Sequence, residues 1–361
     1  MKKSYSSKAF TLIELMVSIF ITITIIASFY KLYNASVKTE RSSSIRVAVN
    51  LMGEQMIDTI AESVRLIGLN STKLYFDGAE GALPNIIIKA TENEFEFLSP
   101  FGSPITKVKE AEGDFPNCTF TLFNSAAFHS GVTKLYFHNQ DGFFKTTNMA
   151  VSSFSGDDVT VVTSAFEENC TGTEKECKCK NMFPNGSLVT GEDFRYTLKY
   201  TATTEDDSEL KLSCKREVGG VWTSDDNCTL IDFKYDPEDS GMVNFYSMPK
   251  FILEYLVEDC VKEPSGSLTC TTKWESSDLD VAKIKEIIAV RFGFVLLSRK
   301  ERIYAGSDTS GTIAKYCIFE DKQFGVSGYY CYELKNLNYT ASVFRRIVYL
   351  SNYRFFIDES R

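Results

Sequence analysis

The sequence predicts an α+β fold in which one long N-terminal helix packs on a large antiparallel, β-rich and disulfide-bonded head. Three observations lead to this prediction. Helical periodicity runs from Phe10 to about Leu69, apolar on all sides at first and on one side later. From Lys73 onward the pattern alternates with a period of two. Ten cysteines are present, all at or beyond Cys118. We therefore divide the chain into a basic segment at 1–9, a transmembrane half-helix at 10–33, an amphipathic half-helix at 34–69 and an extracytoplasmic head at 70–361.

The stretch from Phe10 to Tyr33, FTLIELMVSIFITITIIASFYKLY, is long and apolar enough to cross a bilayer as a helix. Up to Tyr30 its only ionisable residue is Glu14, and a carboxylate so close to hydrocarbon is a candidate functional residue that needs a positive partner. The preceding segment, MKKSYSSKA, carries three lysines and no acid, which favours a cytoplasmic N-terminus. The head is then expected on the other side of the membrane.

Beyond the membrane the apolar residues follow one face of a helix at intervals of three or four. They are Ile45, Val49, Met52, Met56, Ile60, Val64 and Ile67. Gly68, followed by Asn70, is a typical stop signal. We expect one helix from near Thr11 to about Leu69, with its second half held against a sheet of the head.

The segment KAFTLIELMVSIFI resembles the N-terminus of type IV prepilins and type II secretion pseudopilins, in which a short basic leader precedes a Phe and the fifth mature residue is Glu. The resemblance implies that residues 1–9 are a prepilin leader peptide and that the fold is pilin-like. It implies that a prepilin peptidase cuts between Ala9 and Phe10 and methylates the new amino terminus. Glu14 would then be the fifth mature residue, although Ala9 stands where the family usually has Gly.

Cleavage would create a cationic amine on Phe10, and opposite charges attract strongly where the dielectric constant is low. Glu14 lies one helical turn away, so it could pair with the amine of its own chain. Pairing with the amine of a neighbouring subunit would instead set the register of subunits in a fibre. The third alternative is a carboxylate that merely snorkels to the cytosolic interface.

The head is expected to contain strands separated by turn residues, with its clearest hairpin between Lys134 and Thr147 around Asn139-Gln140-Asp141-Gly142. The segment from Glu167 to Gly191 is cysteine-dense and is expected to be a disulfide-pinned excursion, opening a Cys-rich sub-lobe over 165–230. The expected strands are 85–90, 94–98, 119–123, 134–138, 143–147, 159–163, 195–201, 209–213, 230–235, 250–257, 268–274 and 287–297.

An even number of cysteines confined to the exported part predicts disulfides in an oxidising compartment. Short spacings favour the pairs Cys214–Cys228, Cys260–Cys270 and Cys317–Cys331. The other four, Cys118, Cys170, Cys177 and Cys179, are expected to pair among themselves in an arrangement that the spacing leaves open. Structural zinc is the alternative for Cys177-Lys-Cys179, but the usual ligand spacings are missing.

Composition and motifs give little support for catalysis. The formal net charge is −9, and the leader alone contributes three lysines, so an acidic surface argues against nucleic acid as the main partner. No common nucleophile, phosphate-binding or zinc-protease motif occurs. The only histidines are His129 and His138, and we expect His138 to be a polar residue flanking a turn. The acidic turn from Tyr235 to Gly241 is a weak candidate for calcium. We predict no enzyme activity, catalytic residue, cofactor or metal site.

The closing segment from Val343 to Tyr353, with Arg345 and Arg346, resembles the end of PilW-type minor pilins, and the segment from Glu286 to Arg299 resembles the strand before it. We expect the two arginines to face water or a carboxylate. These resemblances imply a minor type IV pilin of the inner membrane and later the pilus, with the prepilin peptidase, other minor and major pilins and a surface or host ligand as partners. The alternatives are a type II secretion pseudopilin and, in another class, a membrane-anchored periplasmic binding protein or enzyme.

Overall fold

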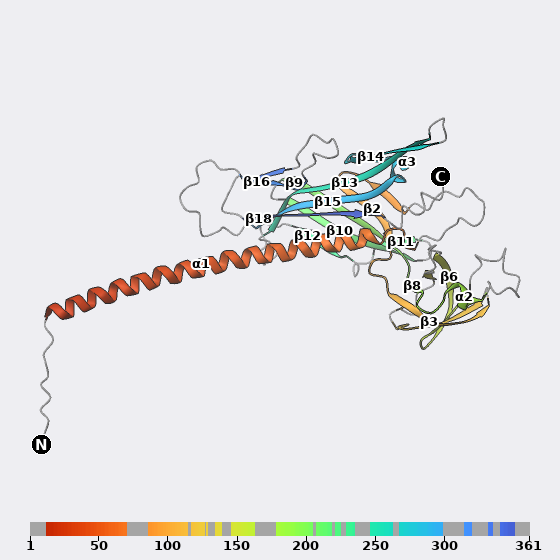
Figure 1. Cartoon of the computed structure of the whole chain (residues 1–361), viewed down its shortest axis with the longest axis horizontal. Coiled ribbons are helices and arrows are strands. Elements are labelled where there is room, and N and C mark those ends of the chain that lie inside the picture. Colours follow the sequence, from red (N-terminus) through yellow and green to blue (C-terminus); the bar gives the residue numbers. More distant parts are fainter. Residues whose placement is uncertain are drawn as a thin grey trace, which may run out of the picture.

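A long helix projects from a β-rich head in the computed structural model of the chain (Figure 1). The predicted cleavage site at Ala9 and Phe10 lies outside the described residues, and so do the predicted disulfide cysteines Cys170, Cys177 and Cys228. The structure describes residues 12–70, 86–114, 117–126, 128, 134–138, 146–162, 178–204, 207–218, 221–224, 229–234, 246–262, 267–298, 314–319, 331–334 and 340–350.

Helix α1 (Leu12–Arg65) is 54 residues long, and a turn follows it as far as Asn70. These bounds agree with the predicted helix. The predicted apolar stripe is confirmed, because Ile45 and Met52 are partly buried and the others are buried. The buried residues of α1 all lie in its second half and are Val49, Gly53, Met56, Ile57, Ile60, Ala61, Ser63 and Val64.

Two antiparallel sheets form the main part of the head. The first has the order β1 (Ile87–Ala90), β2 (Glu94–Ser99), β9 (Phe194–Thr204), β10 (Asp207–Val218) and β11 (Val221–Ser224). Strand β12 (Ile231–Lys234) also pairs with β10. The second has the order β14 (Leu268–Glu275), β13 (Tyr246–Lys262), β15 (Ile287–Ser298) and β18 (Thr340–Tyr349). Short helix α3 (Val281–Ile284) precedes β15, and the Asp280 side chain caps it by accepting from the Lys283 N–H.

The two sheets pack face to face as a sandwich, and they share one hydrophobic core with the second half of α1. Phe95, Phe97 and Tyr196 come from the first sheet, and Phe292 and Phe344 come from the second. Every residue of β15 is buried, because this central strand is covered on both faces. The hairpin of β16 (Ala314–Cys317) and β17 (Cys331–Leu334) lies over the outer face, where Ile318 and Phe319 pack near it. Burial on both faces explains why the strand is apolar at nearly every position rather than at every second one.

A closed six-stranded barrel forms a separate lobe at the end of the head remote from the start of α1 (Figure 1). Its core includes Phe120, Phe137 and Phe183, and short helix α2 (Cys179–Met182) lies against β3. The barrel is inserted in the chain between β2 and β9, two strands that are neighbours in the first sheet, where Ser99 of β2 pairs with Phe194 of β9. In closure order its strands are β3 (Ile105–Asp114), β4 (Asn117–Leu122), β7 (Asp158–Val162), β6 (Thr146–Ser155), β5 (Lys134–His138) and β8 (Leu188–Thr190).

The observed lobe differs from the expected one. The barrel lobe spans 105–190, whereas the sub-lobe was expected at 165–230, so the two ranges overlap only at 165–190. The lobe ends at 190 because β9 to β12 belong to the first sheet. Cysteine density marks cross-links rather than the boundary of a core, so it misplaced the lobe. The predicted hairpin is confirmed as the β5–β6 pair, with β6 starting at Thr146. Strand β3 was not predicted, because most of its residues are exposed and many are charged. Strands β8, β11, β16 and β17 were also missed.

Candidate functional site

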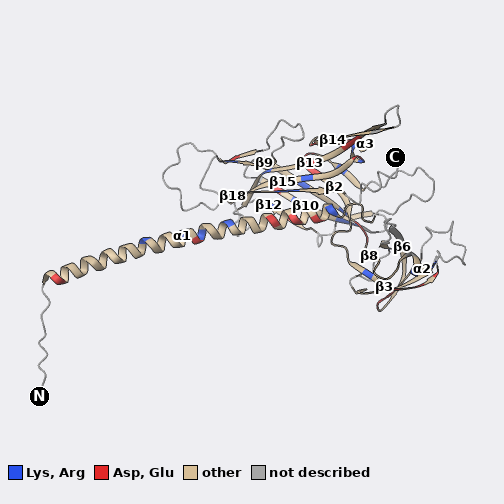
Figure 2. Cartoon of the chain, in the orientation of Figure 1, with Lys and Arg blue, Asp and Glu red and all other residues tan. Residues whose placement is uncertain are grey.

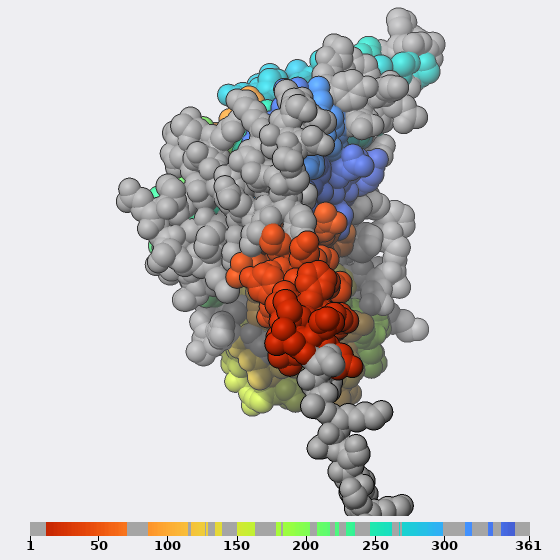
Figure 3. Space-filling view, turned by 90° about the vertical axis from the view of Figure 1, so that its left-hand side faces the viewer, coloured from red at the N-terminus to blue at the C-terminus, as the bar shows by residue number. Residues whose placement is uncertain are grey.

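The N-terminal half of α1 stands outside the head and exposes its apolar side chains. Between Leu12 and Tyr33 the large hydrophobic residues have exposed fractions of 48% to 75%. Seen from the N-terminal side, this part of α1 stands in front of the head (Figure 3). By length and composition alone, α1 is the one helix of the described chain suited to crossing a membrane, with a window of mean hydropathy 2.3. An exposed apolar surface of this length is unfavourable in water and is compatible with membrane anchoring.

Glu14 lies in the first turn of α1, and it is exposed rather than packed against the head. It is the only acid before Glu40, and the helix shows few charges before its second half (Figure 2). A carboxylate in the first turn is stabilised by the positive end of the helix dipole. Since the predicted cleavage site at Ala9 and Phe10 is not described, the pairing of Glu14 with a new amine stays a prediction.

Three hydroxyl side chains in the apolar half are satisfied within the helix. Thr22 donates to the Ser18 carbonyl at 2.7 Å, Thr24 to Phe20 at 2.9 Å and Ser28 to Thr24 at 2.8 Å. Such back-bonding removes the need for water at these positions. The segment therefore presents an apolar surface despite its threonines and serines.

The second half of α1 is fixed along β18. Gly53 lies under the ring of Phe344, and Ser342 donates to Asn50 at 2.8 Å. Arg346 bridges two acids one turn apart on the helix, reaching Glu54 at 3.1 Å and Asp58 at 2.9 Å.

Of the two arginines expected to face water or a carboxylate, Arg346 does so and remains 44% exposed. The other, Arg345, donates instead to the Ile318 carbonyl at 3.2 Å.

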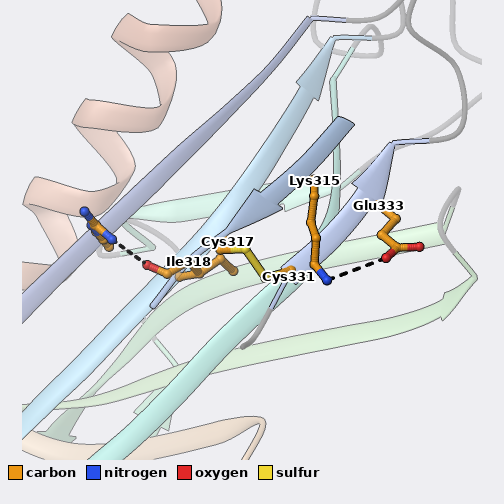
Figure 4. Close-up of a disulfide and its surroundings, with 6 residues drawn as sticks. Lys315, Cys317, Ile318, Cys331 and Glu333 are labelled. Atoms are coloured by element: carbon orange, nitrogen blue, oxygen red, sulfur yellow. Dashed lines mark hydrogen bonds and ion pairs between the residues drawn. A yellow bond between two sulfur atoms is a disulfide. The ribbon is translucent and has the colours of Figure 1, made fainter. Parts of the chain in front are cut away.

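The described disulfides join paired strands or join a strand to a short helix. Cys260–Cys270 links β13 to β14, as its short spacing predicted. Cys317–Cys331 links β16 to β17, also as predicted (Figure 4). Cys118 of β4 is bonded to Cys179 of α2 inside the barrel, one of the pairings that the sequence left open. This bond removes Cys179 as a thiolate for the alternative zinc site. Cys214 is also disulfide-bonded.

A buried ion pair that sequence reasoning missed lies on the outer face of the second sheet. Arg291 of β15 bonds to Glu254 of β13, and both side chains are at most 3% exposed. The guanidinium lies 4.4 Å from the centre of the Trp274 ring and 4.7 Å from that of Phe319. Each residue is a single charge in an otherwise apolar run, FILEYL and IIAVRF, and that signal was available in the sequence.

His138 is a buried junction residue rather than the polar turn residue that was expected. Its Nε2 lies 2.9 Å from the Thr190 hydroxyl, which in turn donates to the Asn70 side chain. Burial lowers the pKa of His138 to about 4. Burial raises the pKa of Asp193 to about 7, although a hydrogen bond to Asn70 opposes this shift. With a neutral imidazole in a saturated network, His138 is a poor candidate for a general base.

Metal and ligand sites have little support among the described residues. Glu258, Cys260 and Cys270 place potential metal ligands together, but the two sulfur atoms are bonded to each other. The calcium candidate from Tyr235 to Gly241 lies entirely outside the described residues. A groove of about 740 Å³ lies between α1 and β12, with Leu51 and Phe233 in its walls. A second depression of about 520 Å³ lies at the barrel rim near Phe128 and Phe154.

No family model and no curated protein matches the sequence. Among solved structures, a type IV-like pilin from Thermus thermophilus is similar at 9% identity, covering 62% of this chain and 87% of that chain with a TM-score of 0.23. A likeness at this level decides nothing about function. The structure itself shows the long apolar N-terminal helix, the β-rich head and the disulfides.

Proposed function

We propose that the chain is a minor type IV pilin of the PilW kind, which takes part in initiating pilus assembly or in the complex at the pilus tip. The observation that carries the proposal is the division of α1. Its first half exposes an apolar surface with one carboxylate near the start, and its second half is clamped to a folded head. A subunit that first resides in a membrane and later joins a helical bundle needs both halves.

In this proposal a prepilin peptidase removes residues 1–9, and the inner membrane holds 10–33 until assembly. The new amine on Phe10 then pairs with Glu14 of a neighbouring subunit as the helix leaves the lipid. A charge pair 4 Å apart is worth about 4 kcal/mol at an effective dielectric constant of 20, and desolvation opposes part of this. Other minor and major pilins are the partners of the apolar half, and the chain is assigned no catalytic chemistry.

The size of the head favours the tip over the shaft. The sandwich and the inserted barrel together widen the subunit well beyond its stalk (Figure 1). A tightly packed filament has little room for such a head in every repeat, whereas a tip position leaves it unobstructed. An adhesive role toward a surface or host ligand would suit this position.

The test uses the full chain in its own cells, with N-terminal sequencing of the mature protein and recovery from sheared fibres. We expect the mature chain to begin at a methylated Phe10. The variant Glu14→Ala should be processed yet remain in the membrane fraction, whereas Glu40→Ala, which removes an exposed acid of the same helix, should enter fibres normally.

A mature chain that still begins at Met1 would contradict the proposal and favour a membrane-anchored periplasmic protein. Normal processing with a defect confined to protein secretion would favour a type II secretion pseudopilin. Equal recovery of Glu14→Ala and the unaltered chain from fibres would remove the assembly role of Glu14.

A further inference from the structure

The barrel lobe is connected to the rest of the head by two short stretches that lie side by side. The first, 100–104, leads from β2 into β3, and the second, 191–193, leads from β8 into β9. They are in close contact, since Gly191 donates to the Pro104 carbonyl at 3.1 Å. A Cβ on Gly191 would lie only 2.3 Å from the Ser103 hydroxyl oxygen. The two stretches thus form one narrow junction.

Few other contacts among the described elements hold the barrel in place. The barrel has a core of its own, separate from the core that the sandwich shares with α1. Among the described elements, no barrel strand packs extensively on a strand of the sandwich or on α1. Lobes joined by a small interface are expected to move relative to one another. The orientation of this lobe therefore depends on the junction.

The C-terminal end of α1 binds both stretches of the junction. Ser99, the last residue of β2 before the first stretch, donates to the Ser63 carbonyl of α1 at 2.8 Å, and both residues are fully buried. Asn70, after α1, donates to the Gly191 carbonyl at 2.8 Å and accepts from the Thr190 hydroxyl. Asn70 also bonds to Asp193.

The hydrogen bonds of this network run in one consistent direction. Because the Thr190 hydroxyl donates to Asn70, it accepts from His138, whose Nε2 must then carry the proton. His138 belongs to the barrel, Asp193 to the connection and Asn70 to the end of the stalk. His138, Thr190 and Asn70 are at most 4% exposed. A buried network in which each member is satisfied holds one geometry firmly.

We propose that the Asn70 network is a latch that fixes the barrel lobe in one orientation relative to α1, and that the lobe turns on its two connections when the latch is broken. The proposal does not depend on whether the chain assembles into a pilus. It assigns Asn70 a positioning role, because its amide joins the stalk to the barrel strand β8 through Thr190 and to the second connection through Gly191 and Asp193.

The experiment measures the distance between the stalk and the barrel in the full-length chain in detergent. Spin labels are attached through a keto amino acid at Val47 of α1 and at Phe123 of the barrel, which are 62% and 66% exposed, so that the disulfides stay intact. Electron–electron double resonance then gives the distance distribution. We expect one narrow peak for the unaltered chain, and a broad or shifted distribution for Asn70→Asp and Thr190→Val.

Each variant removes the latch with little change in volume. Asn70→Asp can still accept from Thr190 but cannot donate to Gly191, and it faces the Asp193 carboxyl group. Thr190→Val removes the hydroxyl that links His138 to Asn70. The matched controls are Asn50→Asp, which keeps the acceptor for Ser342, and Thr121→Val, which loses a barrel hydrogen bond to Asp158 away from the junction. Both controls should keep the narrow peak.

Two results would overturn the proposal. The first is a broad distance distribution for the unaltered chain, because a latched lobe has one orientation. The second concerns Thr190→Val, which is expected to fold even if Asn70→Asp does not, since valine fits a β-strand and leaves the barrel core intact. A narrow and unshifted peak for Thr190→Val would show that something other than this network orients the lobe.

Discussion

The ring of Phe344 in β18 occupies the space that a side chain at Gly53 of α1 would need. A Cβ built on Gly53 would lie 2.1 Å from Cζ of Phe344, well inside van der Waals contact. Both residues are buried in the core that joins the stalk to the head. A glycine in the middle of a helix costs about 1 kcal/mol relative to alanine. The close approach of the aromatic ring explains why a glycine occupies this position in the helix despite that cost.

Gly53→Ala should therefore destabilise the head although alanine favours the helix. Relief of the helix penalty gains about 1 kcal/mol, whereas a forced shift of a packed ring costs about 1–3 kcal/mol. We expect a net loss of up to about 2 kcal/mol, measured by chemical unfolding of the full-length chain in detergent. In a Phe344→Leu background the same change should be neutral or stabilising. Equal effects in both backgrounds would contradict the close contact.

The buried pair Glu254–Arg291 should depend on both of its members. Glu254→Leu leaves the Arg291 guanidinium buried without its carboxylate, and we expect a loss of about 3–5 kcal/mol. Replacing both residues, as Glu254→Leu with Arg291→Met, should recover most of this loss, because methionine keeps contact with the Trp274 and Phe319 rings. Thermal unfolding of the three chains tests this. A double variant as unstable as the single variant would contradict it.

The exposed bridge from Arg346 to α1 provides the matching control. Arg346→Met removes ion pairs to Glu54 and Asp58 whose side chains are more than half exposed. We expect a loss of less than about 1 kcal/mol that shrinks further in high salt. A loss as large as that of Glu254→Leu would mean that position on the β18 edge, rather than burial, sets the cost.

The sequence was sufficient where the signal is local. The stripe from Ile45 to Ile67 fixes both the helix and the face that it buries, and short spacing identified Cys260–Cys270 and Cys317–Cys331. The barrel could not be found in this way, because it depends on pairings between distant segments such as Ile105 with Thr190. A lone Gly53 in a helix also indicates only a lower propensity, and nothing near it in the sequence points to Phe344.

The disulfide inside the barrel should stabilise its lobe more than the hairpin disulfide stabilises β16 and β17. Cys118 and Cys179 are 61 residues apart, against 14 for Cys317 and Cys331. Loop-closure entropy gives about 4 kcal/mol for the first bond and about 3 kcal/mol for the second. Paired Cys→Ala variants should lower the unfolding midpoints in that order. The reverse order would show that packing of the hairpin, and not loop length, dominates.

The junction between stalk and barrel should show two opposing pH dependences. Burial lowers the pKa of His138 to about 4, so its contribution to stability is present above the ordinary pKa of 6.5 and is lost as the pH falls from 6.5 through 4. Burial raises the pKa of Asp193 to about 7 from 3.8, so its contribution is present in acid and is lost as the pH rises from 3.8 toward 7. Between pH 4 and 6.5 the two slopes cancel, because folding moves one proton from the histidine to the aspartate.

Single variants should expose the two slopes. His138→Gln keeps a donor for Thr190 and leaves only the aspartate, so the chain should become more stable as the pH falls from 6.5 to 4.5. Asp193→Asn leaves only the histidine, and the chain should become less stable over the same range. Each slope is on the order of 1 kcal/mol per pH unit at most. Unfolding midpoints measured against the unaltered chain subtract the pH dependence of all other groups, and parallel slopes for the two variants would refute the assignment.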